Sequence, residues 1–203
     1  MKKVFLLVAA LALLCLGVAA QAALVNLSLE PSTSTVSVGD PFSLELWMRS
    51  SPTGQSLDGA DVNLQWNPLY VRFDGFVENG DYDWMTVFYT NESKPGFDPT
   101  FSDGTAEFTL FAQLPRPSPP TPYTDLHALT LNFTALAATD STSLTIPSSL
   151  PGNLPTCVAW QGDDITGTLT GADIEIVPVP EPSSIIALAG GLIPLLAMKR
   201  RKA

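Results

Sequence analysis

The chain has 203 residues, of which twenty are aspartate or glutamate, ten are lysine or arginine and one is histidine. Only four of the basic residues lie between the two chain ends, against nineteen acidic ones, so the middle of the chain is strongly negative. Such a surface repels the phosphate backbone, which excludes nucleic acid as a partner. The length suits one folded domain with a single core.

The N-terminus predicts a signal helix over residues 1–22. Two lysines precede an uncharged apolar run, and the small residues Ala20 and Ala22 stand just before Ala23. This order is typical of a secretory signal peptide that is cleaved after Ala22. We therefore expect the protein to be exported and its mature part to begin at residue 23.

Residues 23–178 are predicted to form one all-β domain. Alternating or β-branched runs bounded by Gly, Pro, Asn and Asp recur along it, and no helical period lasts three turns. The pattern predicts an antiparallel β-sandwich. We expect Trp47 and Trp66 in its core, and long surface loops over 114–124 and 147–167, which are rich in proline or glycine. The predicted strands are 25–30, 35–38, 42–49, 60–66, 71–77, 84–90, 105–112, 127–135, 143–146 and 173–177.

Residues 179–203 combine three features in order: a Pro-Glu-Pro motif, an uncharged apolar stretch over 185–198 and a basic end. The apolar stretch predicts a short transmembrane helix with its basic end in the cytoplasm. A plain C-terminal membrane anchor has the same topology. The motif residues are Pro180, Glu181 and Pro182, and the basic residues are Lys199, Arg200, Arg201 and Lys202.

This tail resembles the PEP-CTERM sorting signal of Gram-negative bacteria that make exopolysaccharide. The resemblance implies that an exosortase-type enzyme recognises residues 180–182 and processes the protein. It also implies a location in the inner membrane during transit, and afterwards in the cell envelope or outside the cell.

Three segments of the middle resemble a cohesin or a related carbohydrate-binding-module-like sandwich, a jelly-roll fold. They are Val36–Leu44 with its Gly39-Asp40 turn, Ala60–Pro68 and Leu129–Ala135. The resemblance implies an extracellular binding module whose partner is a dockerin-like protein or an extracellular polysaccharide. The chain departs from the family at Asn67, where the usual residue is aspartate, and in its proline-rich insert.

The sequence offers little for catalysis. His127 is the only histidine, and no common nucleophile, zinc or phosphate-binding motif occurs. Cys15 lies in the signal segment, which leaves Cys157 as the one cysteine of the mature domain, and we expect it to be a small buried hydrophobe. We therefore expect no catalytic residues and no enzyme activity.

Calcium is the one cofactor that the sequence keeps open. Asp81, Asp83 and Glu92 have the spacing of a twelve-residue calcium loop, but the places between them that need an oxygen ligand and a glycine hold other residues. A less regular site would use carboxylates of neighbouring loops. Its candidates are Asp58, Asp61, Asp163 and Asp164.

A candidate binding surface combines aromatic residues, which stack on sugars, with an acidic pair. Its members are Tyr82, Trp84, Trp160, Asp163 and Asp164. Together these features predict an exported, non-enzymatic module that binds protein or polysaccharide. The alternatives are a structural acidic matrix component that binds cations and, with the least support, an enzyme that processes polysaccharide.

Overall fold

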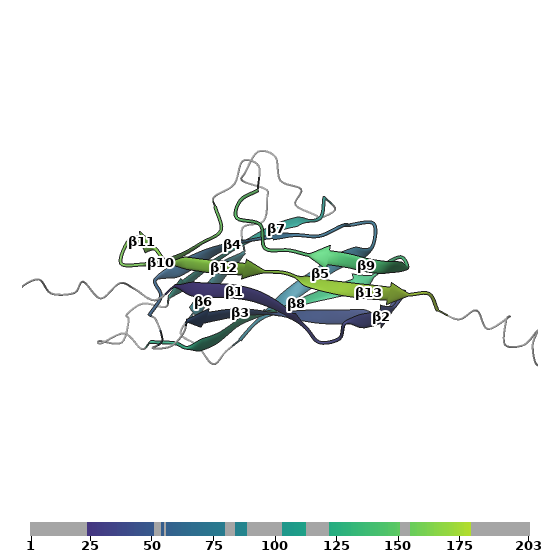
Figure 1. The fold of residues 1–203 in the computed structure, drawn as a ribbon, viewed down its shortest axis with the longest axis horizontal. Helices are drawn as coiled ribbons and strands as arrows, with labels where there is room; N and C mark the ends of the chain where they lie inside the picture. The colour runs from purple at the N-terminus through teal and green to yellow at the C-terminus, as the bar shows by residue number, and fades with distance from the viewer. Residues whose placement is uncertain are drawn as a thin grey trace, which may run out of the picture.

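A computed structural model describes residues 24–50, 54, 56–79, 84–88, 103–112, 122–150 and 155–179. These residues form an all-β sandwich with two five-stranded sheets and a three-stranded sheet (Figure 1). No helix among them is long and apolar enough to cross a membrane. The signal segment and the residues from Pro180 onward lie outside the described residues.

The first sheet has the order β12-β1-β3-β8-β5, the second β11-β10-β4-β7-β6 and the third β2-β13-β9. Their bounds are β1 (Val25–Pro31), β2 (Thr35–Ser37), β3 (Pro41–Ser50), β4 (Gly59–Gln65), β5 (Val71–Glu78), β6 (Trp84–Phe88), β7 (Thr105–Ala112), β8 (Asp125–Ala135), β9 (Thr139–Leu144), β10 (Cys157–Trp160), β11 (Asp163–Asp164), β12 (Thr166–Thr170) and β13 (Ala172–Val177).

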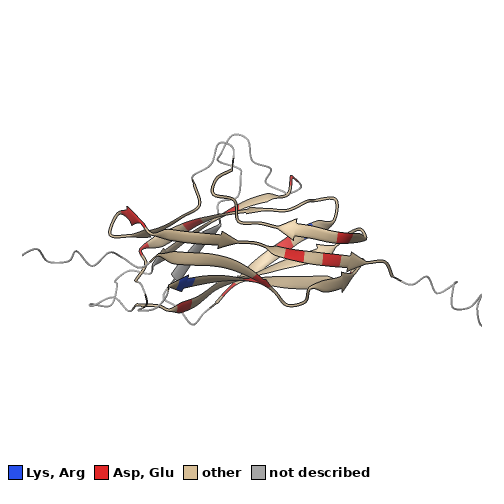
Figure 2. Cartoon of the chain, in the orientation of Figure 1, with Lys and Arg blue, Asp and Glu red and all other residues tan. Residues whose placement is uncertain are grey.

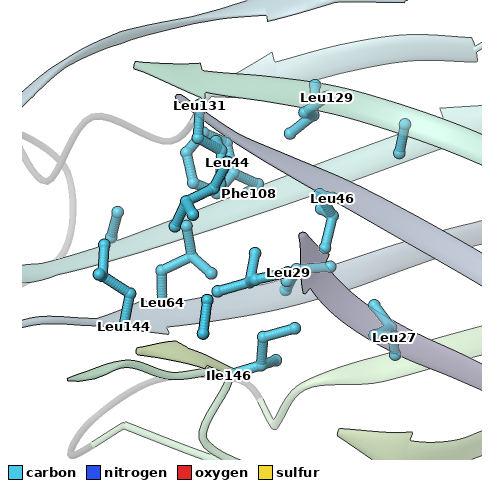
Figure 3. Close-up of a cluster of buried hydrophobic side chains, with 14 of the residues drawn as sticks. Leu27, Leu29, Leu44, Leu46, Leu64, Phe108, Leu129, Leu131, Leu144 and Ile146 are labelled. Atoms are coloured by element: carbon cyan, nitrogen blue, oxygen red, sulfur yellow. The ribbon is translucent and has the colours of Figure 1, made fainter. Parts of the chain in front are cut away.

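The hydrophobic core lies between the layers and is built from alternate residues of the strands. In β3, Leu44, Leu46 and Met48 are buried, whereas the residues between them face outward. Leucines from β1, β3, β4, β8 and β9 meet Phe108 of β7 there (Figure 3). Burial of these apolar side chains supplies the main driving force for folding.

An aromatic cluster holds one part of this core. The ring of Phe133 lies 5.6 Å from Phe42, 5.6 Å from Trp66 and 5.3 Å from Phe73, measured between ring centroids. The prediction that Trp66 is a core residue is confirmed, since only 4% of it is exposed.

Trp47 is not in the core, and this prediction was wrong. It lies on the outer face of β3, where His127 stacks on its ring at 4.9 Å and the guanidinium of Arg49 lies over it at 4.6 Å. Arg49 also pairs with Glu30 of β1 and Asp125 of β8, so it ties three strands together. The hydrogen bond from Arg49 lowers the pKa of Glu30.

Two further differences concern the end of the chain. The segment predicted as a loop over 147–167 contains β10, β11 and the first residues of β12. The sandwich is also not wholly antiparallel, because β1 pairs with β12 and β2 pairs with β13 in parallel. Residues 166–177 therefore run as two successive strands beside the first strands of the chain (Figure 1).

The chain enters the sandwich at one end and leaves it at the other. Val25 donates a backbone hydrogen bond to Ile165 at the end that carries β11, whereas β13 leaves the molecule at the opposite end (Figure 1). We call the first the β11 end and the second the tail end. The start and the exit of the domain are thus separated by the length of the sandwich.

Candidate functional site

A pocket of about 300 Å³ opens at the β11 end, on the second sheet. It lies at the start of β4. There the amide of Asp58 donates to the carbonyl oxygen of Ala159 at 2.7 Å, which joins the start of β4 to β10. Its lining comes from the neighbouring strands β4, β7 and β10: Asp58, Gly59, Ala60, Asp61, Thr109, Leu110, Phe111, Cys157 and Ala159.

Two carboxylates belong to this pocket, and each is oriented by a hydrogen bond. Thr109 Oγ1 donates to Asp61 Oδ1 at 2.6 Å across the β4–β7 pair. The amide of Gln161 donates to Asp58 Oδ2 at 2.6 Å. Both aspartates are partly exposed, so they remain open to solvent and to a ligand.

The remaining wall of the pocket is largely apolar. Phe111 is 41% exposed although it is a large hydrophobic residue, and Ala159 is partly exposed opposite it. A hydrophobic side chain exposed beside two carboxylates is a combination that suits an amphipathic ligand.

Cys157 lies in the same pocket and is only half-buried, so the expectation of a buried cysteine was wrong. Its Sγ lies 3.9 Å from Asp61 Oδ2. Burial raises the pKa of the Cys157 thiol, and the charges of Asp61 and Asp164 raise it further. The thiol is therefore a poor nucleophile at neutral pH.

A short turn extends the acidic edge of the pocket. Gln161 and Gly162 both have positive φ angles, of 52° and 86°, and this turn returns the chain into β11. Asp164 then pairs with Ala159 of the pocket wall, and Asp163 pairs with Trp160. Figure 2 shows acidic residues, in red, at this tip.

The rest of β4 is covered by the connection from β9 to β10. Asn63 faces away from the core and yet is fully buried. Its backbone amide and its side-chain Nδ2 both donate to Thr156 Oγ1 at 3.1 Å. The same hydroxyl donates to the carbonyl oxygen of Pro147 at 2.6 Å. The middle of β4 is therefore covered, and the pocket is located at the start of the strand, where Asp58 and Asp61 are partly exposed.

The structure brings together part of the predicted surface. Asp163 and Asp164 are exposed beside the pocket, whereas Trp160 is partly buried against the core. Trp84 begins β6, of which only the backbone is described, and Tyr82 lies outside the described residues. The predicted cleavage site at Ala20, Ala22 and Ala23 is also outside them.

The calcium candidates do not form a compact ligand set. Within the described part of the chain, no group of three or more His, Cys, Asp and Glu side chains could hold a metal ion. Asp58 and Asp61 instead accept the hydrogen bonds described above. Asp164 Oδ1 accepts from the amide of Thr166 at 2.9 Å.

Of the nine lining residues, sequence reasoning named only Asp58 and Asp61 as site candidates and missed the other seven: Gly59, Ala60, Thr109, Leu110, Phe111, Cys157 and Ala159. The available signal was the outward alternation of β7, which places Thr109 and Phe111 on the same face. The pairing of β10 with β4 had no comparable signal, because the two strands are about a hundred residues apart.

The fold is that of cohesin modules. The cohesin module of a family 33 glycoside hydrolase from Clostridium perfringens is 14% identical, with a TM-score of 0.58, and the match covers 77% of this chain and 99% of that one. A type II cohesin from the cellulosome of Acetivibrio cellulolyticus is 15% identical over 74% of this chain and 95% of its own, with a TM-score of 0.54.

The third cohesin of ScaC from Acetivibrio cellulolyticus, solved in complex with the ScaB dockerin, is also similar. It is 15% identical over 75% of this chain and 99% of its own, with a TM-score of 0.52. No family model matches the sequence. No curated protein matches it either.

Proposed function

We propose that this chain is an exported, non-enzymatic module that binds a dockerin-like protein at the pocket of the β11 end. The observation that carries the proposal is the pairing of two oriented carboxylates, Asp58 and Asp61, with the exposed ring of Phe111. A lysine or arginine of a partner fits this combination, because its aliphatic stem covers the ring while its charged head meets the carboxylates.

The charge of the molecule supports a basic partner. Both basic residues in the described part, Arg49 and Arg72, are ion-paired, so acidic side chains dominate the surface (Figure 2). Such a surface steers positively charged partners toward it. The solved complex of a structurally similar cohesin with a dockerin supports a protein partner of that class.

The tail belongs to the same proposal. In it, an exosortase-type enzyme sorts the protein through Pro180, Glu181 and Pro182, and the apolar stretch 185–198 holds it in the membrane before processing. The order of motif, apolar stretch and basic end supports this. Binding of polysaccharide, or of cations by an acidic matrix component, remains the alternative.

The test compares two double variants of equal charge. Asp58→Asn with Asp61→Asn changes the pocket, whereas Asp40→Asn with Asp140→Asn changes exposed acids at the tail end. Surface plasmon resonance against the dockerin-like proteins encoded in the same genome should show an affinity loss of about tenfold or more for the pocket variant. The control variant should bind within about twofold of the unchanged protein.

Cys157 gives a second readout without any substitution. A partner seated in the pocket should slow its alkylation by iodoacetamide, measured at alkaline pH because the raised pKa keeps the thiol protonated at neutral pH. Equal binding by both double variants, or alkylation unchanged at saturating partner, would place the binding site elsewhere. If the unchanged chain binds none of these proteins but binds the polysaccharide of the producing cells, the protein-binding function is wrong.

A further inference from the structure

The tail end of the sandwich carries a group of exposed apolar side chains that the proposed function does not use. Leu69 is 73% exposed, Val179 54% and Leu136 41%, and Val38 and Tyr70 beside them are half-buried. We call these five residues the apolar rim.

Backbone hydrogen bonds join the segments that carry the rim. The amide of Leu136 donates to the carbonyl oxygen of Tyr70 at 2.7 Å, which links the β8–β9 turn to the β4–β5 turn. The amide of Val38 donates to the carbonyl oxygen of Val177 at 3.0 Å, next to the exit of the chain. The amide of Gly39 donates to the carbonyl oxygen of Ala135 at 2.8 Å and connects these two pairs. Three turns and the end of β13 are thus next to one another.

The β4–β5 turn directs Leu69 outward. Asn67 Oδ1 accepts from the amide of Leu69 at 3.0 Å, and the Asn67 carbonyl oxygen accepts from the amide of Tyr70 at 3.1 Å. The turn is therefore fixed by its own hydrogen bonds, while the leucine side chain is left in solvent. A fixed apolar tip has little conformational entropy to lose when it enters an apolar environment.

The length of the chain between the rim and the apolar stretch limits how far the rim can lie from a membrane. Five residues lie between Val179 and Ile185, where the apolar stretch begins. The six Cα-to-Cα steps that join the two span at most about 20 Å in an extended chain. If that stretch enters a bilayer, the rim lies within about 20 Å of it, and the headgroup layer occupies several ångströms of that distance. The tether then holds the end of β13, with the rim beside it, close to the membrane surface.

We infer that the apolar rim rests on the lipid bilayer, with Leu69 and Leu136 at the boundary between headgroups and acyl chains. The inference rests on the proposed membrane insertion of the tail. Asp40 and Asp140 are exposed at the same end and would be repelled by anionic lipid, so the surface that fits is zwitterionic phospholipid. Two copies anchored in one membrane stand side by side, which disfavours contact between their rims.

The test uses the full chain in vesicles of phosphatidylcholine and phosphatidylethanolamine. With Cys15 and Cys157 replaced by serine, an environment-sensitive fluorophore is attached at Leu69→Cys, at Leu136→Cys or at Val77→Cys. Val77 is a matched control, because it is 58% exposed but lies in β5, away from the rim. Iodide quenching should fall at least about twofold on vesicle binding at the two rim positions and stay unchanged at the control.

The outcomes separate the two proposals. If the chain floats with the vesicles while all three labels are quenched equally, the rim does not touch lipid and the inference is wrong, although the anchor stands. A chain that fails to float refutes membrane insertion and the inference with it. Protection that appears only at high protein-to-lipid ratio indicates contact between copies and also overturns it.

Amide hydrogen exchange provides a measurement on the unsubstituted chain. Vesicle binding should slow exchange in the turns at 38–40, 66–70 and 136–138, and it should leave the turn at 161–162 unchanged. Equal exchange in the rim turns with and without vesicles would contradict contact between the rim and lipid. This measurement needs no substitution.

Discussion

At the scale of single residues, two buried threonines give opposite predictions. Thr156 Oγ1 takes part in three hydrogen bonds, whereas Thr142 Oγ1 is buried with no hydrogen-bond partner in the described structure. Thr156→Val should lower the free energy of unfolding by about 1–3 kcal/mol, because buried donors on Asn63 lose their acceptor. Thr142→Val should be neutral or raise it by up to about 1 kcal/mol. Urea unfolding measures both.

Thr156→Ser is the control for this pair, since it keeps the hydroxyl. A loss of stability for Thr142→Val equal to that for Thr156→Val would show that the two hydroxyls are equivalent, and the hydrogen-bond account of the β9–β10 connection would be wrong.

The two strand tryptophans show what could be predicted at this scale. Trp66 was placed correctly because a large aromatic residue at the end of an apolar strand is usually buried. Trp47 was misplaced, although the alternation of β3 contains the signal: Glu45 and Arg49 flank it on the same face. What the sequence could not provide is the stack with His127, which depends on an irregularity in the pairing of β3 and β8 between Leu46 and Trp47.

At the scale of elements, substitutions at two turn glycines distinguish the cost of steric contact from the cost of backbone strain. Gly39 and Gly104 have φ angles of +89° and +76°. A Cβ at Gly39 would meet nothing within 4 Å, whereas one at Gly104 would lie 2.7 Å from Pro68 Cδ and even closer to the carbonyl oxygen of Trp66. Gly39→Ala should cost about 1–2 kcal/mol and Gly104→Ala about 3 kcal/mol or more.

Thermal unfolding of the two alanine variants checks this order. Gly104 also fixes the turn before β7, because its carbonyl oxygen accepts a hydrogen bond from the amide of Trp66 at 2.8 Å. Equal costs at both sites would mean that the turn before β7 moves freely enough to absorb a side chain.

The strands themselves were largely predictable, and the exceptions have a physical reason. Strands with long alternation, such as β3, β4, β7 and β8, were predicted within two residues of their ends. β10, β11 and β12 were missed because all three are short. β11 consists of two exposed acids and β12 contains a glycine, whereas β10 is ordered by its pairing with the distant β4. The pocket depends on β10, so most of its far wall could not be predicted.

At the scale of the whole molecule, the excess of acidic residues predicts a dependence on salt. Repulsion among these charges opposes the compact state, and salt screens it. Raising NaCl from about 10 mM to about 150 mM should increase the melting temperature by a few degrees, equivalent to about 1 kcal/mol. The Asp40→Asn, Asp140→Asn variant should show a smaller increase. A melting temperature that falls with salt would mean that attractive ion pairs such as Arg49 with Glu30 dominate instead.

The position of β13 has a mechanical consequence. This strand is bonded on both sides, in parallel to β2 and antiparallel to β9, and it is the last strand before the tail. When a partner at the β11 end and the tail are pulled apart, the traction runs along the strands, and the backbone hydrogen bonds of β13 lie across it. They are then loaded together in shear, so many must break at once before the strand slides out. A domain connected in this way transmits force between its two ends without being peeled open.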